Sequence, residues 1–222
     1  MTAADVLAQP LLLQPSGQRL KNRLFKSAMS EGMADRTGRP TPELIALYAA
    51  WADGGIGQCV TGNVMIDHRA LGEPGNVVIE DDSHLDALRS WAEAATRHDT
   101  RCWVQLNHPG KQAPKGLNAE TVAPSAVPFE ARALQLAFGT PRALTEDEIL
   151  ALIGRFATAA GIVQQAGFSG VQIHGAHGYL VSQFLSPRHN QRTDDWGGTL
   201  ENRLRFAELI VRAVRDAAGP DL

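Results

Sequence analysis

Short apolar runs alternate along this chain with longer stretches in which apolar residues recur every three or four positions. The short runs are typical of buried strands, and the recurring positions predict helices that bury one face. The pattern predicts strands at residues 23–27, 56–60, 101–106 and 170–173, each followed by a helix. Regular alternation of strands and helices favours an α/β fold with parallel strands.

The residues at the predicted helix starts support this assignment. Thr41 stands before Pro42, which suits an N-cap followed by the first helical position. Ser83 is predicted to cap the second helix. Thr145 and Glu148 have the spacing of a capping box, in which each side chain bonds the backbone of the other residue. A last helix is expected to start at residue 199.

Two segments lie outside the strand–helix pattern. Residues 11–13 and 18–20 flank a Pro-Ser-Gly turn at residues 15–17, which predicts a small hairpin ahead of the main domain. Residues 107–144 are rich in proline, glycine and alanine and are expected to be irregular. Structureless connections of that length are typical of lids or binding loops.

Composition narrows the class of protein. The chain is predicted to form one domain over residues 1–222, with 44% hydrophobic and 20% charged residues, as in ordinary globular proteins. A net charge of −3 gives no general attraction to nucleic acid or to an anionic membrane. No apolar run approaches the roughly 20 residues that span a bilayer, and the first residues lack the pattern of a signal peptide.

The two cysteines, Cys59 and Cys102, fall in different predicted strands. We expect buried free thiols rather than a disulfide, and free thiols fit a reducing compartment. The sequence therefore predicts a cytoplasmic protein without nucleic-acid or membrane partners.

Candidate chemistry gathers after the strand at residues 170–173, where His174 is followed by a glycine-rich turn, His177 and Tyr179. In barrels of alternating strands and helices, catalytic residues lie at the carboxyl ends of the strands. Two hydrogen-bond donors and a phenol at that place suggest polarisation of a substrate oxygen and delivery of a proton. Taken alone, a His-x-x-His loop equally fits polar side chains that only satisfy the loop backbone.

The following residues narrow that choice. Between residues 171 and 203 the chain contains VQIHGAHGYL, SQFLSP and NQRTDDWGGTLENR. These motifs closely resemble the signature of the old yellow enzyme family, the flavin-dependent ene-reductases and NADH:flavin oxidoreductases. The resemblance implies a (β/α)8 TIM barrel, of which this chain is expected to hold the N-terminal hairpin and about the first four βα units, ending before the fifth strand.

The resemblance also implies flavin mononucleotide (FMN) as cofactor, with NADH or NADPH as hydride donor. Gly62 would let the flat flavin ring approach the backbone, and Gln105 would offer a donor and an acceptor to its polar edge. The hydroxyl of Ser30 would donate to a flavin carbonyl. The residues expected along one face of the ring are Ser27, Ala28, Met29 and Ser30. Without the resemblance, these positions equally fit a polar loop and a backbone-bonded glutamine.

By the same resemblance, residues 174–179 carry catalysis. The substrate, a small molecule such as an enone, would lie against His174, Gly175, Ala176 and His177. The two histidines would stabilise the substrate oxygen, and Tyr179 would protonate carbon, since a phenol keeps its proton at neutral pH. The implied function is NAD(P)H-dependent reduction of activated alkenes by hydride transfer through flavin N5.

Two other functions compete with this one. A half-barrel leaves two strand edges unpaired, so the chain could be a catalytically incompetent or partner-dependent fragment of such an enzyme. The same edges predict a homo-oligomer or self-association. The phosphate site of many such barrels follows the last two strands, so weak FMN binding is expected. A metal-dependent hydrolase is disfavoured because the His-x-x-His lies in a loop, and no metal is expected.

Overall fold

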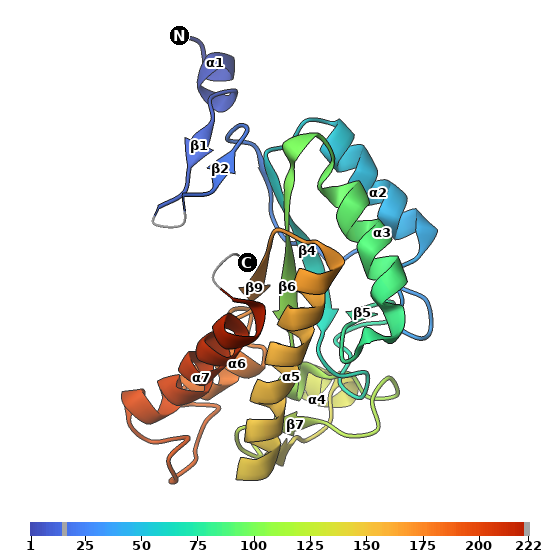
Figure 1. Cartoon of the computed structure of the whole chain (residues 1–222). Helices are drawn as coiled ribbons and strands as arrows, with labels where there is room; N and C mark the ends of the chain where they lie inside the picture. Colours follow the sequence, from blue (N-terminus) through green and yellow to red (C-terminus); the bar gives the residue numbers. More distant parts are fainter. Residues whose placement is uncertain (15–16, 220–222) are drawn as a thin grey trace.

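The computed structural model describes residues 1–14 and 17–219. Its main sheet is parallel, and four of its strands lie side by side in chain order (Figure 1). They are β3 (Phe25–Lys26), β4 (Gln58–Met65), β6 (Arg101–Asn107) and β9 (Gly170–Ile173). A short fifth strand, β5 (Val77–Val78), pairs with the end of β4. The predicted α/β fold with parallel strands is therefore confirmed, as a partial barrel.

Four long helices cover the outer side of this sheet (Figure 1). They are α2 (Pro42–Asp53), α3 (Leu85–Ala95), α5 (Glu146–Ala166) and α7 (Leu200–Ala218). Trp91 of α3 lies at the centre of the core between helices and sheet, with its ring edge-on to Tyr48 at 5.1 Å and to Phe168 at 5.4 Å. Buried aromatic rings in this geometry stabilise a core beyond the area that they bury.

The helix starts follow the predictions with one exception. The Thr41 side chain accepts a hydrogen bond from the backbone at the start of α2, and Thr145 forms the predicted capping box of α5. The prediction for Ser83 was wrong. The carboxylate of Asp81 accepts from the Ser83 N–H and starts a short 3-10 turn, η1 (Asp82–His84), which leads into α3.

The strand boundaries differ from the predicted ones because the number of neighbouring strands decides how far each strand extends. Within the described residues β3 has one neighbouring strand, and only two of its five predicted residues enter the ladder. By contrast, β4 lies between neighbours and runs five residues beyond the predicted end at residue 60. The polar residues Thr61 and Asn63 ended the apolar run in the sequence, although both belong to the strand.

The N-terminal hairpin is confirmed, with β1 (Leu11–Leu12) antiparallel to β2 (Arg19–Leu20). Residues 15 and 16 of its predicted turn lie outside the described residues. A short helix, α1 (Ala3–Leu7), precedes the hairpin and was not predicted, although Thr2 and Asp5 form a capping box at its start. Figure 1 shows these elements beyond the end of the sheet at which the strands begin.

The expectation that residues 107–144 are structureless was wrong in part. The segment is held from within, because the buried Lys111 side chain donates to the carbonyl oxygens of Val127 and Pro128. Its short elements are η3 (Gly110–Gln112), β7 (Val122–Ala123), α4 (Arg132–Ala137) and β8 (Arg142–Ala143).

Cys59 and Cys102 lie directly opposite each other on β4 and β6, both buried and both free, as predicted. The expectation that no run is long enough to span a bilayer was wrong for helix α5, which is long and apolar enough to do so by length and composition alone. Half of that stretch is buried, and α5 packs between α3 and α7 as the core helix of a globular domain does. The expectation of no membrane partner stays a prediction.

Both outer strands of the main sheet have a free edge within the described residues, since β3 pairs with β4 alone and β9 with β6 alone. Phe25 of β3 is 54% exposed, and a hollow lined mainly by apolar residues, among them Ile173 of β9 and Val214 of α7, lies beside β9. Free strand edges beside exposed apolar side chains favour association. The expected homo-oligomer or self-association stays a prediction.

Candidate active site

Three aromatic rings gather at the carboxyl end of β9. The backbone N–H of His174 donates to the carbonyl oxygen of Leu106 on β6, at 3.0 Å, which fixes where the strand ends. The ring centroid of His174 lies 5.1 Å from that of His177 and 4.9 Å from that of Tyr179. The three residues that the sequence proposed as catalytic are thus together, at the end of the sheet where such chemistry is expected.

His174 is buried in a way that sets its protonation. Its Nδ1 accepts a hydrogen bond from the Ala176 N–H at 3.3 Å, so the neutral ring carries its proton on Nε2. Burial, and after it the neighbouring His177, lowers the pKa of His174 to about 4. At neutral pH the ring is therefore uncharged and offers one N–H donor.

This burial predicts how stability depends on pH. The unfolded ring titrates at its ordinary value and the folded ring at a lower one, so the neutral form is favoured by folding. The contribution of His174 to stability is fully present above about pH 6.5, falls as the pH drops towards 4, and is constant below. NMR titration of the histidine Cε1–H signals, with His174→Gln for assignment, should give a midpoint near 4 for this ring. A midpoint near 6.5 would show that water reaches it freely.

His177 and Tyr179 are carried by one tight turn. His177 has a left-handed backbone, with φ of 56°, and its carbonyl oxygen accepts from Gln112 Nε2 at 2.8 Å. Tyr179 is the N-cap residue of α6 (Leu180–Leu185), and its N–H donates to the Ala176 carbonyl at 3.2 Å. The turn presents the exposed His177 ring and the half-buried Tyr179 ring on the same side as His174. Gly175 and Ala176, also expected at the substrate, are exposed within it.

Gln183 joins this turn to the loop that follows β6, and sequence reasoning missed it. Its side chain is fully buried, and its Nε2 donates to the carbonyl oxygens of Gly178 at 2.7 Å and Pro109 at 3.1 Å. Its Oε1 accepts from the Lys111 N–H at 3.1 Å. The available signal in the sequence was a long polar side chain in helix α6, whose other residues are apolar except for Ser182.

Gln105 has a partner that the sequence did not suggest. Its Nε2 donates to Oε1 of Gln172 on β9 at 2.7 Å, while its backbone N–H donates to the Thr61 hydroxyl at 2.9 Å. Gln172 belongs to β9, which ends one residue before His174. Among the described residues, the Gln105 amide keeps its oxygen and its second N–H available for a ligand.

Of the expected flavin contacts, Ser27, Ala28, Met29 and Ser30 form the segment after β3, and Met29 is 55% exposed. The Ser30 hydroxyl donates to the Glu73 carboxylate and accepts from Asn63 Nδ2 at 3.3 Å. A serine has one proton to donate, so in this structure the hydroxyl is committed to Glu73. The expected donation to a flavin carbonyl would require that bond to break.

Gly62 is needed at its position, although for a reason other than the expected one. Its N–H donates to Oε1 of Glu31 at 3.3 Å. A Cβ at this position would collide with the Met29 carbonyl oxygen and the Glu31 carboxylate. The close approach is therefore that of the neighbouring chain segment, and approach of a flavin ring stays a prediction.

Glu31 holds the segment after β3 in place through its side-chain contacts, and sequence reasoning missed this residue as well. Its carboxylate accepts from the Tyr48 hydroxyl at 2.6 Å and pairs with Lys26 at 3.3 Å. Burial and the Glu31 charge raise the pKa of Tyr48 well above its usual value, so the phenol stays protonated as a donor. Glu31 thus ties α2 and β3 to the residues that end at Ser30.

A separate cluster of carboxylates and histidine lies in the connection after β4. Asp67, His68 and Glu80 each offer one atom within 4.8 Å of the others. Arg69 pairs with Asp67 at 2.8 Å, and Arg155 lies 3.5 Å from Asp67 and 3.6 Å from Glu80. Because guanidinium groups balance these carboxylates, we assign no metal to the cluster.

Comparison with known proteins places this geometry in a family. A sequence model of the NADH:flavin oxidoreductase / NADH oxidase family matches residues 7–222. The chain belongs to this family. The resemblance that the motifs between residues 171 and 203 suggested is therefore confirmed.

Curated relatives in this family are longer than the chain. The NADH-dependent flavin oxidoreductase iccE of Talaromyces variabilis is 41% identical over 225 residues, which cover 94% of this chain and 54% of the relative. The NADPH dehydrogenase of Clostridium acetobutylicum is 36% identical over 89% of this chain and 56% of its own length. The chain thus spans about half the length of these two relatives.

Solved structures show the same fold. The old yellow enzyme homologue from Zymomonas mobilis superposes with a TM-score of 0.86 at 29% identity, over 96% of this chain and 60% of its own. Morphinone reductase in complex with tetrahydroNAD gives a TM-score of 0.87 at 28% identity, over 97% of this chain and 61% of its own. The expected barrel family is confirmed, with this chain forming part of such a barrel.

The described residues fit the ring of a flavin better than its phosphate. The Gln105 amide has a donor and an acceptor available, which suits the polar edge of a flavin, and the backbone at Met29 is open. Two lysines of this part of the chain, one on β3 and one in the loop after β6, already have partners. Lys26 is paired with Glu31, and Lys111 donates to backbone carbonyls of the long loop.

Proposed function

We propose that this chain carries the substrate end of an FMN-dependent NAD(P)H oxidoreductase that reduces activated alkenes such as enones. One observation carries the proposal: the rings of His174, His177 and Tyr179 share one turn at the carboxyl end of β9. The Gln105 amide belongs to the neighbouring strand, β6. Relatives named as NADH-dependent flavin oxidoreductases support the same class of reaction.

Each ring has a distinct part in this proposal. The Nε2–H of His174 and an N–H of His177 donate to the carbonyl oxygen of the substrate and stabilise the negative charge that develops there. Tyr179 holds the proton that is delivered to the α-carbon. The Gln105 amide and the backbone of residues 27–30 orient the flavin ring. When bound, FMN supplies hydride transfer, with NADH or NADPH as the source of the hydride.

A second candidate is a fragment that works only with a partner chain. It is favoured by the share of the relatives that the chain spans, about half, and by the commitment of Lys26 and Lys111 to other groups. If the described residues supply no cation to the phosphate, binding of FMN loses charge complementarity and rests on the ring alone. The ring site and the phosphate site can therefore be tested separately.

Titration with FMN and with riboflavin, which lacks the phosphate, makes this test. Quenching of flavin fluorescence should show weak binding of both, with dissociation constants within a few-fold of each other. NADH should then bleach the flavin absorbance, and an enone should restore it faster than in a solution without protein. Absence of binding by either flavin would contradict the proposed ring site. FMN binding tighter than riboflavin by roughly a hundredfold, as charge-assisted hydrogen bonds give, would contradict the fragment.

A further inference from the structure

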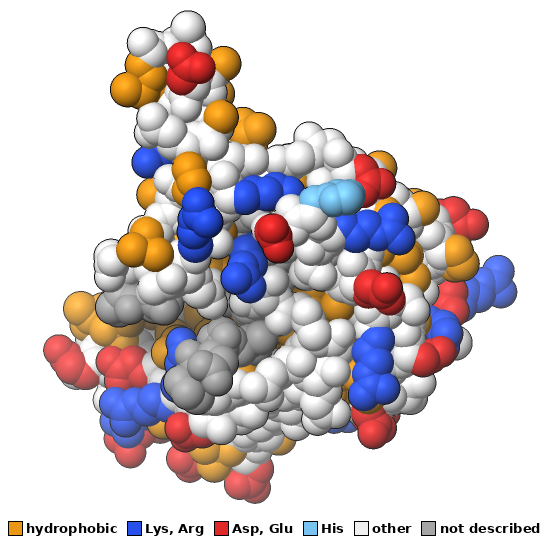
Figure 2. All heavy atoms as spheres, turned by 45° about the horizontal axis from the view of Figure 1, so that its top comes forward, with side chains coloured by type: hydrophobic (Ala, Val, Ile, Leu, Met, Phe, Trp, Pro, Cys, Tyr) orange, Lys and Arg blue, Asp and Glu red, His pale blue; other side chains and the backbone are white. Residues whose placement is uncertain are grey.

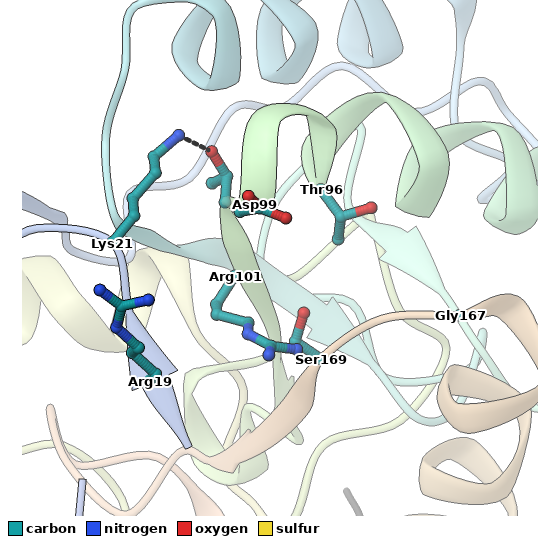
Figure 3. Close-up of a pocket in the computed structure, with 8 residues that line it drawn as sticks. Arg19, Lys21, Thr96, Asp99, Arg101, Gly167 and Ser169 are labelled. Atoms are coloured by element: carbon teal, nitrogen blue, oxygen red, sulfur yellow. Dashed lines mark hydrogen bonds between the residues drawn. The ribbon is translucent and has the colours of Figure 1, made fainter. Parts of the chain in front are cut away.

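An open hollow of about 500 Å³ lies at the end of the sheet opposite to the three rings. It is formed where the hairpin meets the starts of β6 and β9, with the ends of α3 and α5 beside them (Figure 3). Among the described residues its lining has no hydrophobic side chain and consists of Arg19, Lys21, Thr96, Asp99, Thr100, Arg101, Gly167 and Ser169.

The described lining residues carry a net positive charge, with three cationic side chains against the carboxylate of Asp99. Within the described residues, neither Arg19 nor Arg101 has a hydrogen-bond or ion-pair partner for its guanidinium group. Lys21 donates to the His98 carbonyl at 2.7 Å and to the Thr100 hydroxyl at 3.0 Å, which leaves it one further N–H. Figure 2 shows Lys and Arg side chains gathered on the face at which the strands begin.

The polar groups divide into donors and acceptors. The Ser169 hydroxyl accepts from the Cys102 N–H at 3.3 Å, so its own proton is free to donate beside Arg101. The Thr96 hydroxyl donates its proton to the Ala92 carbonyl, so towards a ligand its oxygen acts only as an acceptor. The Asp99 carboxylate is likewise an acceptor only. The carbonyl ends of α3 and α5 add to the accepting side, because helix C-termini carry partial negative charge.

We propose that the hollow binds a phosphorylated polyol, such as a sugar phosphate. The dianionic phosphate matches the excess of two positive charges and would lie between Arg19, Arg101 and Ser169, since guanidinium groups bind phosphate through paired N–H donors. The sugar hydroxyls would donate to Asp99, Thr96 and the helix-end carbonyls. A hollow of this volume exceeds the needs of a free phosphate ion, and its polar lining does not suit an apolar ligand.

Isothermal titration calorimetry at constant ionic strength tests the proposal. The ligands are glucose 6-phosphate, inorganic phosphate and glucose. Glucose 6-phosphate should bind with saturation, phosphate more weakly, and glucose not measurably. Arg101→Gln should weaken the binding of glucose 6-phosphate on the order of tenfold to a hundredfold, as expected for charge-assisted hydrogen bonds. The control is Arg212→Gln, which removes the same charge from an exposed position on α7 and should leave binding unchanged.

Equal losses in these two variants would mean general charge attraction and would overturn the proposal, as would the absence of saturable binding. Phosphate binding as tight as that of the sugar phosphate would overturn the polyol part. Arg19→Gln provides a second test if Arg101→Gln fails to fold, because Arg19 is exposed on the hairpin. It should weaken binding by a similar factor. Since flavin and NADH are absent from this experiment, its outcome is independent of the proposed redox function.

Discussion

Replacing Tyr179 by phenylalanine should slow reduction of an enone on the order of 10²–10⁴-fold while leaving reduction of the flavin by NADH unchanged. Only reduction of the enone needs a proton at carbon, and the variant removes only the hydroxyl that would supply it. Among the described residues this hydroxyl has no hydrogen-bond partner, so its loss should not disturb the turn, which is held by backbone bonds such as that from Tyr179 to Ala176. Stopped-flow absorbance, with the protein in excess over the flavin so that most of the flavin is bound, measures the two steps separately.

The chain offers a matched comparison, because Tyr48 is its other tyrosine. Tyr48→Phe removes a buried hydroxyl that donates to the Glu31 carboxylate at 2.6 Å. It should lower the free energy of unfolding by about 1.5–3 kcal/mol, without a selective effect on the enone step. If Tyr179→Phe instead slows both steps equally, the tyrosine has a structural role. If it slows neither, the proton comes from water or from another residue.

The fold could be predicted largely from the sequence because its signals are local. Helix caps and apolar periodicity each depend on residues within a few positions of one another. The errors arose where tertiary pairing decides the outcome. The length of β4 depends on strands on both sides of it, and burial there overrides the polar residues Thr61 and Asn63.

In the candidate active site, too, the residues close together in sequence were predicted and those with distant partners were missed. His174, His177 and Tyr179 lie within six residues, so one motif predicts their proximity. The residues that hold them and the flavin segment in place were missed because their partners are distant in sequence. Glu73 reaches Ser30 across 43 positions, and Gln183 reaches Pro109 across 74. Neither spacing follows from a local pattern.

Replacing His174 and replacing His177 should affect the stability of the protein differently. The His177 side chain is exposed, so His177→Ala removes a donor without leaving a cavity in the core. His174 is 6% exposed, and its Nδ1 accepts from the Ala176 N–H. His174→Ala should therefore also lower the free energy of unfolding, because it leaves a space and an unsatisfied N–H.

Both alanine variants should weaken the binding of a phenol to the flavin-loaded chain and raise the barrier to enone reduction by roughly 3 kcal/mol, since each removes a donor to the oxygen. Titration with a phenolic ligand and stopped-flow reduction measure the two effects, and thermal unfolding measures stability. His98→Ala is the control, because His98 is exposed and pairs with Asp53, away from the turn. A loss of stability without a change in phenol affinity in His174→Ala would make that ring a packing residue. Unchanged affinity and rate in His177→Ala would remove it from the oxygen site and leave His174 as the donor.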